Sequence, residues 1–169
     1  MVTEEKPDLV IVTGDIAYPI PPQAGTSDNL TEAKLFATLM ENLGVYWTVT
    51  FGNHDTEAYS KYDRAQIADF YENSGFKYCL FKSGPDDIDG YGNNVINIKN
   101  SKGEITQSIF TFDSHAYLNH DILGFGYNYD NIRESQVEWY RECVEKFTAY
   151  NRSVSNMENP VPKSTAFFH

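Results

Sequence analysis

Two short clusters of residues that can bind a metal lie in the first third of the chain, and each follows an apolar, strand-like run. The first cluster is Gly14-Asp15, and the second is Gly52-Asn53-His54-Asp55. Carboxylate, amide oxygen and imidazole groups all suit a divalent metal. Glycine lets the backbone turn sharply and come close to a bound group. A third apolar run, Thr165 to Phe168, ends at His169. The residue types therefore predict metal chemistry, provided that the fold brings these three places together.

The first two clusters follow the strands of a predicted strand–helix–strand unit. Leu9 to Val12 is a short apolar run that favours a buried parallel strand. Val45 to Phe51 is rich in β-formers. Between them, Asn29 to Leu43 follows a helical period; Asn29 and Glu32 resemble a capping box, and Gly44 is a natural stop. Because ligands gather beyond the carboxyl ends of parallel strands, we expect both clusters to face one crevice.

The remaining sequence alternates helices, turns and strands, which is typical of an α/β protein. We expect a Pro-rich loop at 19–25, helices at 62–73 and 134–150, a hairpin with strands at 95–99 and 108–112, and a last strand at 165–168. That last strand directs His169 to the same crevice by the same logic. Residues 113–115 follow a strand and are interpreted either as cleft residues or as ordinary loop residues.

The chain is acidic, which limits its partners. It has 13 Lys and Arg against 24 Asp and Glu in 169 residues, a formal charge of −11. Such a field repels phosphate backbones, so nucleic acid is not an expected partner. A small anionic substrate stays possible, because a bound metal inverts the local field. No run approaches the ~18 apolar residues of a membrane span. The sequence predicts neither an oligomeric state nor a compartment.

The clusters resemble the calcineurin-like metallophosphoesterases. The pattern of that family has five blocks: Asp-x-His, Gly-Asp, Gly-Asn-His-Asp/Glu, a lone His after a strand, and Gly-His-x-His. Three are matched, by Gly14-Asp15, by Gly52-Asn53-His54-Asp55 and by Phe167-Phe168-His169. The stretch from Tyr129 to Tyr140 is similar to the purple-acid-phosphatase-related branch. The resemblance implies a partial α-β-β-α sandwich with mixed sheets inside and helices outside.

The same resemblance implies roles for the matched residues. Asp15 would bridge two metal ions, and Asn53 and His169 would bind the second one. His54 would face the substrate phosphate, where it stabilises charge or protonates the leaving oxygen. Asp55 would orient His54 and hold it protonated, because an adjacent carboxylate favours the imidazolium form. The implied cofactors of the intact protein are two divalent or mixed-valence ions of Mn, Fe or Zn.

Tyr18 carries a further resemblance, because it follows Asp15 by three residues. An Asp-x-x-Tyr at this place resembles the block that supplies a tyrosinate ligand to ferric iron in purple acid phosphatases. Other branches of the family lack this tyrosine. We therefore keep two interpretations for Tyr18, an iron ligand and an ordinary pocket aromatic, and favour the second.

Two blocks of the family have no match where they are expected. The Asp-x-His block should lie on a strand upstream of Asp8, and the Gly-His-x-His block should lie beyond His169. Val2 to Glu5 resembles the end of a helix that connects such strands. We therefore expect residues 1–169 to be a single, incomplete domain. By itself it should hold one metal ion or none and hydrolyse phosphate esters slowly or not at all.

The leading functional hypothesis is hydrolysis of a small phosphorylated substrate by a metal-activated water at a dinuclear site. A phosphomonoesterase is favoured over a phosphodiesterase by analogy with the purple-acid branch. The alternative is a non-catalytic binding or scaffold protein that kept the fold with an incomplete metal site. The His54-Asp55 pair favours catalysis, because scaffolding places no demand on it.

Overall fold

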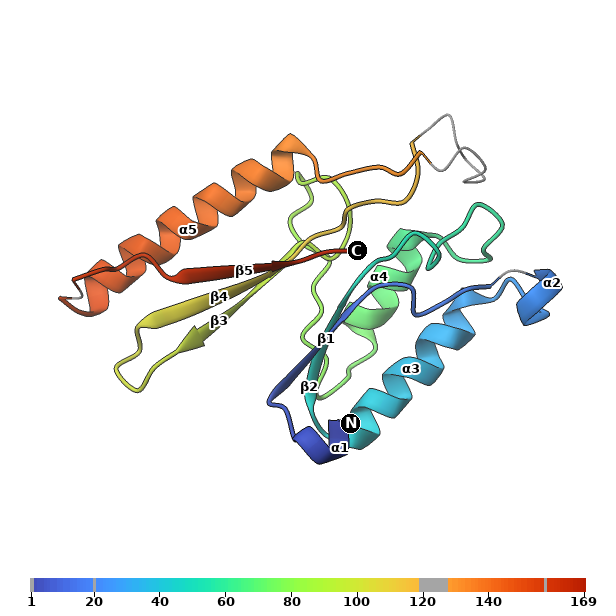
Figure 1. The fold of residues 1–169 in the computed structure, drawn as a ribbon, viewed down its shortest axis with the longest axis horizontal. Coiled ribbons are helices and arrows are strands. Elements are labelled where there is room, and N and C mark those ends of the chain that lie inside the picture. The colour runs from blue at the N-terminus through green and yellow to red at the C-terminus, as the bar shows by residue number, and fades with distance from the viewer. Residues whose placement is uncertain (1, 20, 119–127, 157) are drawn as a thin grey trace.

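Helices form the two outer layers of the molecule and two sheets form the inner layers (Figure 1). The computed structural model describes residues 2–19, 21–118, 128–156 and 158–169. α5 (Glu134–Val154) covers one sheet, while α3 (Asn29–Leu43) and α4 (Arg64–Asn73) lie on the outer side of the other sheet (Figure 1). This arrangement confirms the predicted fold class, a partial α-β-β-α sandwich.

The first sheet consists of two parallel strands, β1 (Leu9–Thr13) and β2 (Tyr46–Thr50). Leu9 is level with Tyr46, and Thr13 is level with Thr50. Both strands therefore end at the same height, and the residues after them leave the sheet side by side. The parallel pairing agrees with the predicted strand–helix–strand unit.

Two one-turn helices flank this sheet in the sequence. α1 (Val2–Glu5) precedes β1, at the place of the predicted helix end. α2 (Pro21–Ala24) lies in the predicted Pro-rich loop. A proline at the first helical position fits this helix start, because its missing N–H has no partner to lose there and its φ is already helical.

The start of α3 differs from the prediction by one residue. Asp28 is the N-cap, and its carboxylate accepts a hydrogen bond of 3.1 Å from the backbone N–H of Thr31. The predicted capping box of Asn29 and Glu32 is therefore wrong. Asn29 is instead fully buried inside the first turn. The end of the helix agrees with the prediction, since Gly44 adopts the left-handed conformation with φ 67°.

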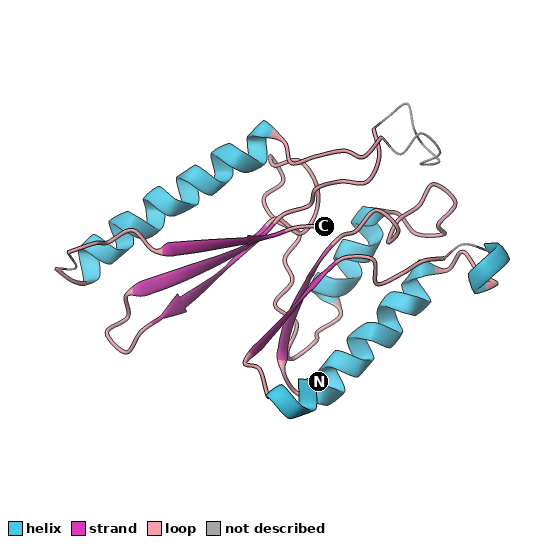
Figure 2. Cartoon of the chain, viewed as in Figure 1, coloured by secondary structure: helices cyan, strands magenta, loops and turns pink. Residues whose placement is uncertain are grey.

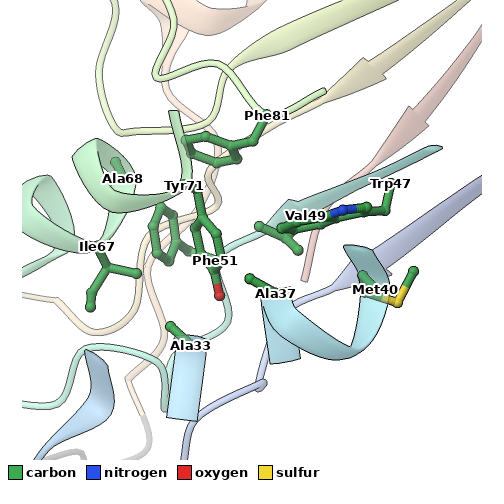
Figure 3. Packing of buried hydrophobic residues seen from close by; sticks show 10 residues of the cluster. All are labelled: Ala33, Ala37, Met40, Trp47, Val49, Phe51, Ile67, Ala68, Tyr71 and Phe81. Atoms are coloured by element: carbon green, nitrogen blue, oxygen red, sulfur yellow. The ribbon is translucent and has the colours of Figure 1, made fainter. Parts of the chain in front are cut away.

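α3 and α4 pack on β2 through a cluster of buried apolar side chains (Figure 3). Trp47 and Phe51 are no more than 1% exposed. The Tyr71 ring of α4 lies 5.9 Å from the Trp47 ring and 5.6 Å from the Phe81 ring. Burying side chains of this size stabilises a fold by roughly 1.5–3 kcal/mol each. The cluster therefore fixes the end of β2, from which the second metal-capable cluster of residues emerges.

The second sheet has three strands in the order β3 (Asn94–Lys99), β4 (Ile105–Thr111) and β5 (Lys163–Phe167). β3 and β4 form the predicted antiparallel hairpin, and β5 runs parallel to β4, so the sheet is mixed. Thr111 is level with Phe167, and the N–H of Phe112 donates to the carbonyl of Phe167 over 2.9 Å. Figure 2 shows β1, β2, β4 and β5 running toward the same side of the molecule, where loops and the C-terminal end gather.

α5 lies on the second sheet through aromatic contacts. The ring of the buried Phe110 lies 4.8 Å from the Tyr140 ring and 5.7 Å from the Trp139 ring, so both half-buried helix aromatics pack against the sheet. The helix continues to Val154, beyond the predicted end at Tyr150. Its buried Gln136 donates to the carbonyl of Asp113 over 2.7 Å, so it ties the segment after β4 to the helix. None of the helices in the described ranges is long and apolar enough to cross a membrane.

Asn151 connects α5 to β4 and to the segment that leads into β5. Its side chain is fully buried; Nδ2 donates to the carbonyls of Ile105 and Pro160, and Oδ1 accepts from the N–H of Ile105, each over 2.8 Å. We expect Asn151→Ala to lower the free energy of unfolding by about 1–3 kcal/mol, because buried backbone groups lose their partners. Urea unfolding measures this. The exposed Ser153→Ala is the control and should stay within about 0.5 kcal/mol. An unchanged stability of Asn151→Ala would contradict the role of this connection.

Candidate metal centre

The loops after β1 and β2 contact each other backbone to backbone. Gly14 and Asp15 both have a left-handed backbone, with φ of 91° and 54°. A Cβ on Gly14 would lie 2.4 Å from the nitrogen of Gly52, and a Cβ on Gly52 would lie 2.1 Å from Oδ1 of Asp15. Neither distance is possible for real atoms. Gly14 and Gly52 must therefore both be glycine, because any side chain there would overlap the other loop. Their close contact places Asp15 next to the second cluster.

The Asp55 side chain connects these two loops through hydrogen bonds to their backbone N–H groups. One carboxylate oxygen accepts from the N–H groups of Gly52 (2.7 Å) and Asp15 (2.9 Å), and the other accepts from the N–H of Ala17 (2.9 Å). The residue is 5% exposed. Burial raises the pKa of the Asp55 carboxyl, while the three backbone donors oppose that shift. On the other side, Asn29 donates to the carbonyl of Asp55 over 2.9 Å. Asp55 is thus held on both sides and acts as a clamp between the loops.

Three predicted metal ligands, Asp15, Asn53 and His169, lie close together in space. Nε2 of His169 lies 3.3 Å from Oδ2 of Asp15 and 3.1 Å from Oδ1 of Asn53. The other ring nitrogen, Nδ1, lies 2.7 Å from the carbonyl oxygen of Thr13, which accepts a hydrogen bond from it. Asp15 is held in turn by the backbone N–H of His54, which donates to Oδ1 over 3.0 Å. The fold thus brings together residues that follow β1, β2 and β5.

The chemistry of these donors fits a divalent cation. With its proton on Nδ1, a neutral His169 presents a lone pair from Nε2 to two oxygen atoms that are themselves acceptors. A cation between the three atoms removes this conflict; the alternative is an imidazolium paired with Asp15. Metal-binding histidines usually donate the other ring N–H to a carboxylate, a backbone carbonyl or water, as Nδ1 of His169 does to Thr13. Within the described residues, no three His, Cys, Asp or Glu side chains gather to hold a metal. The third donor here is the amide oxygen of Asn53.

His54 is held by a different carboxylate from the one predicted. Its Nδ1 lies 2.7 Å from Oε1 of Glu57, whereas the carboxylate of Asp55 is occupied by backbone donors. The predicted role of Asp55 in orienting His54 is therefore wrong. The physical reason is that the backbone N–H groups of Asp15, Ala17 and Gly52 need a buried acceptor. The Asp55 carboxylate is the group that accepts from all three.

Glu57 and Tyr117 were not predicted as site residues. The hydroxyl of Tyr117 donates to Oε1 of Glu57 over 3.0 Å and accepts from Nδ2 of Asn53 over 2.8 Å. Burial raises the pKa of Tyr117 to about 12, so the hydroxyl keeps its proton at neutral pH. Both residues lie in irregular segments and belong to no motif, so no local pattern in the sequence could have found them.

Tyr18 lies against His54. The two ring centroids are 4.3 Å apart with an interplanar angle of 75°, an edge-to-face contact. The backbone N–H of Tyr18 donates to the carboxylate of Glu32 over 3.1 Å. The described contacts of Tyr18 are thus those of a pocket aromatic beside the histidine. Its role as an iron ligand stays a prediction.

Arg64 and Asp113 support the second cluster from the side of α4. They form a buried ion pair in which the Asp113 side chain is fully buried. The guanidinium of Arg64 also donates to the carbonyl of Gly52 over 2.9 Å and to the hydroxyl of Thr56 over 3.1 Å. A planar guanidinium suits such a fixed set of acceptors. The ion pair therefore ties the loop after β2 to the segment after β4.

A cleft of about 310 Å³ opens beside the donor cluster. It is lined by Asn53, His169, residues 114–116, Tyr129 and Asp130. His115 therefore borders the cleft, as one of its two interpretations proposed, and it does so with a left-handed backbone of φ 66°. A larger hollow of about 600 Å³ lies between α3 and α4, lined by Leu30, Lys34, Asp69 and neighbouring residues. It is separate from the donor cluster and contains none of the predicted site residues.

Comparison with known proteins points in the same direction. A sequence model described as calcineurin-like phosphoesterase matches residues 1–164. Three relatives from Arabidopsis thaliana cover 99–100% of this chain: "Probable inactive purple acid phosphatase 14", 28 and 29, at 29%, 26% and 25% identity. The chain spans only 42–43% of the length of these relatives. No solved structure matches the chain.

Proposed function

This chain belongs to the calcineurin-like phosphoesterase family, and on that premise we propose that it takes part in metal-dependent hydrolysis of a phosphate monoester. Asp15, Asn53 and His169 would hold one divalent ion, with Mn, Fe and Zn as the candidates. The observation that carries the proposal is the meeting of Nε2 of His169 with two oxygen acceptors at 3.1 and 3.3 Å. When bound, metal ions of this family's kind neutralise phosphate charge and activate water.

The residues of the chain have distinct tasks in this proposal. Asp15 supplies the negative charge at the site, and Asn53 and His169 supply neutral donors. His54 would stabilise the phosphate or protonate the leaving oxygen through Nε2, because Nδ1 is engaged by Glu57. Asp55 holds the loops together and does not take part in proton transfer. This division rests on which atoms are already occupied by hydrogen bonds.

The cleft and the relatives both favour a small phosphate ester as the substrate. The cleft of about 310 Å³ beside Asn53 and His169 has the size of a small-molecule site. The formal charge of −11 disfavours long polyanions but leaves room for a single phosphate next to a bound cation. A phosphomonoester is preferred over a diester by analogy with the purple acid phosphatases that the chain resembles.

Titration with Mn²⁺ tests the ligand assignment. We expect the chain to bind about one ion. Asn53→Ala and His169→Ala should each weaken binding by more than the roughly 10–100-fold that is lost when a group that only orients a ligand is removed. Isothermal titration calorimetry measures the affinity. The matched control is His54→Ala, which removes an imidazole from the same site without removing a ligand and should bind Mn²⁺ like the wild type. Unchanged affinity of Asn53→Ala and His169→Ala would contradict the assignment.

A second candidate, a non-catalytic binding protein, is favoured by one observation, since all three relatives are named as inactive. Hydrolysis of p-nitrophenyl phosphate with Mn²⁺ separates the two. We expect turnover by this chain to be slow, and to disappear in His54→Ala while Mn²⁺ binding persists. Turnover that disappears in His54→Ala would contradict the binding protein, and equal turnover by the wild type and His54→Ala would contradict the proposed role of His54.

A further inference from the structure

A buried carboxylate just beyond the second cluster receives two hydrogen bonds on a single oxygen. Glu57 is 8% exposed. Its Oε1 lies 2.7 Å from Nδ1 of His54 and 3.0 Å from the hydroxyl of Tyr117. A carboxylate oxygen only accepts, so both neighbours must present a proton to it. Glu57 therefore decides where the proton lies on each of them.

The first consequence reaches Asn53 through Tyr117. A hydroxyl has one proton, and Tyr117 gives that proton to Glu57. Toward Asn53, the Tyr117 oxygen can then only accept, and the partner atom is Nδ2 at 2.8 Å. The amide of Asn53 is thereby fixed with its nitrogen toward Tyr117 and its oxygen toward His169, at 3.1 Å from Nε2. Without this constraint, the amide could turn and present a donor to the metal position.

The second consequence concerns His54 directly. With Nδ1 donating to Glu57, the neutral ring carries its only proton on Nδ1. Nε2 then carries a lone pair and is the atom left for a substrate or for an added proton. Glu57 thus fixes both residues: Asn53 turns its amide oxygen toward His169, and Nε2 of His54 is the nitrogen that takes up a proton before it can donate to a phosphate.

We propose that Glu57 and Tyr117 are positioning residues that fix the amide orientation of Asn53 and the tautomer of His54. The inference rests on the proposed function, since it gives these two residues a task in metal and substrate binding. Tyr117 comes from the segment after β4 and is held there by a bridge to Tyr129, whose ring lies 5.7 Å away. The second half of the chain therefore completes a site whose motif lies in the first half.

Nitrogen-15 NMR of the histidine side chains of the metal-free chain tests the proposal without any activity assay. Spectra are recorded in the alkaline pH range where the ring nitrogen shifts no longer change with pH, so that neutral rings are compared. We expect His54 to be the Nδ1–H tautomer in the wild type and in Tyr117→Phe, and to shift toward Nε2–H in Glu57→Leu, which has no oxygen to accept from Nδ1. His169, whose Nδ1 donates to Thr13, should stay Nδ1–H throughout and reports that each variant is folded.

Mn²⁺ affinity of the same variants tests whether Tyr117 and Glu57 fix the amide orientation of Asn53. Tyr117→Phe and Glu57→Leu should each weaken binding by roughly 10–100-fold, the usual cost of losing a group that orients a metal ligand, whereas His54→Ala should not. Unchanged affinity of Tyr117→Phe would overturn the proposed role of Tyr117 in orienting Asn53. An Nε2–H tautomer of His54 in the wild type, or an unchanged tautomer in Glu57→Leu, would contradict the role of Glu57 in fixing the His54 ring. A wild type that binds no Mn²⁺ contradicts the proposed function and the proposed role of Tyr117 in orienting Asn53, while the tautomer still decides the role of Glu57 on His54.

Discussion

Replacing Gly52 with alanine is expected to abolish Mn²⁺ binding and to lower the free energy of unfolding by about 3 kcal/mol, the upper end of what overpacking costs. The added Cβ would lie 2.1 Å from Oδ1 and 2.4 Å from the backbone nitrogen of Asp15. The nitrogen belongs to the main chain, so the loop cannot relieve the overlap by rotating a side chain. Asp15 must move away from Asn53 and His169, and the donor set comes apart. Calorimetric Mn²⁺ titration and urea unfolding measure both effects.

Gly103→Ala is the matched control for this experiment. Gly103 has a left-handed backbone with φ 82° in the β3–β4 turn, and a Cβ there would meet nothing within 4 Å. Its replacement costs only the backbone strain of about 1–2 kcal/mol and should leave Mn²⁺ affinity unchanged. If Gly52→Ala bound Mn²⁺ as well as Gly103→Ala, the close contact of the two loops would not be what holds the ligands.

The second large effect is expected for Asp55→Asn. The carboxylate serves three backbone N–H groups with two oxygens, and an amide has only one oxygen. The amide NH₂ must then face at least one buried N–H donor. We expect the free energy of unfolding to fall by at least about 3 kcal/mol, since a charge-assisted bond is lost and a buried donor is left unpaired. Turnover should be lost with the fold of the loops rather than by a change in proton transfer.

Urea unfolding compares Asp55→Asn with Asp28→Asn. Asp28 is the N-cap of α3, a position that asparagine fills as well as aspartate, so this change should stay within about 0.5 kcal/mol. The two variants make the same chemical change at a half-buried helix cap and at the buried Asp55. Equal stability of both would show that Asp55 does not hold the loops.

The placement of the donor cluster could be predicted from the sequence because strand order and direction are strongly patterned. Apolar runs before Gly14 and Gly52 predicted two parallel strands, and the carboxyl ends of such strands meet. The same logic brought His169 to this place, although it lies on the other sheet. What made these predictions possible is that strand direction fixes where the ends go, independently of side-chain detail.

The identity of the carboxylate beside His54 could not be predicted in the same way. Asp55 and Glu57 are both acidic and both close to His54 in the sequence. Which of them turns toward the ring depends on where the loop leaves unpaired N–H groups, and that is decided by the contact of Gly14 with Gly52. Tyr117 lies 64 residues from Asn53, in a segment without a motif or a regular period. Such contacts depend on tertiary packing, which local sequence patterns do not predict.

The position of a bound metal ion would decide whether Asp15, Asn53 and His169 are ligands. An anomalous difference map from crystals of this chain grown with Zn²⁺ should show a peak about 2.0–2.2 Å from Nε2 of His169 and from side-chain oxygens of Asp15 and Asn53. A peak at other residues would contradict the assignment of these ligands. So would a map without a peak in which Nε2 of His169 is still paired directly with the carboxylate of Asp15.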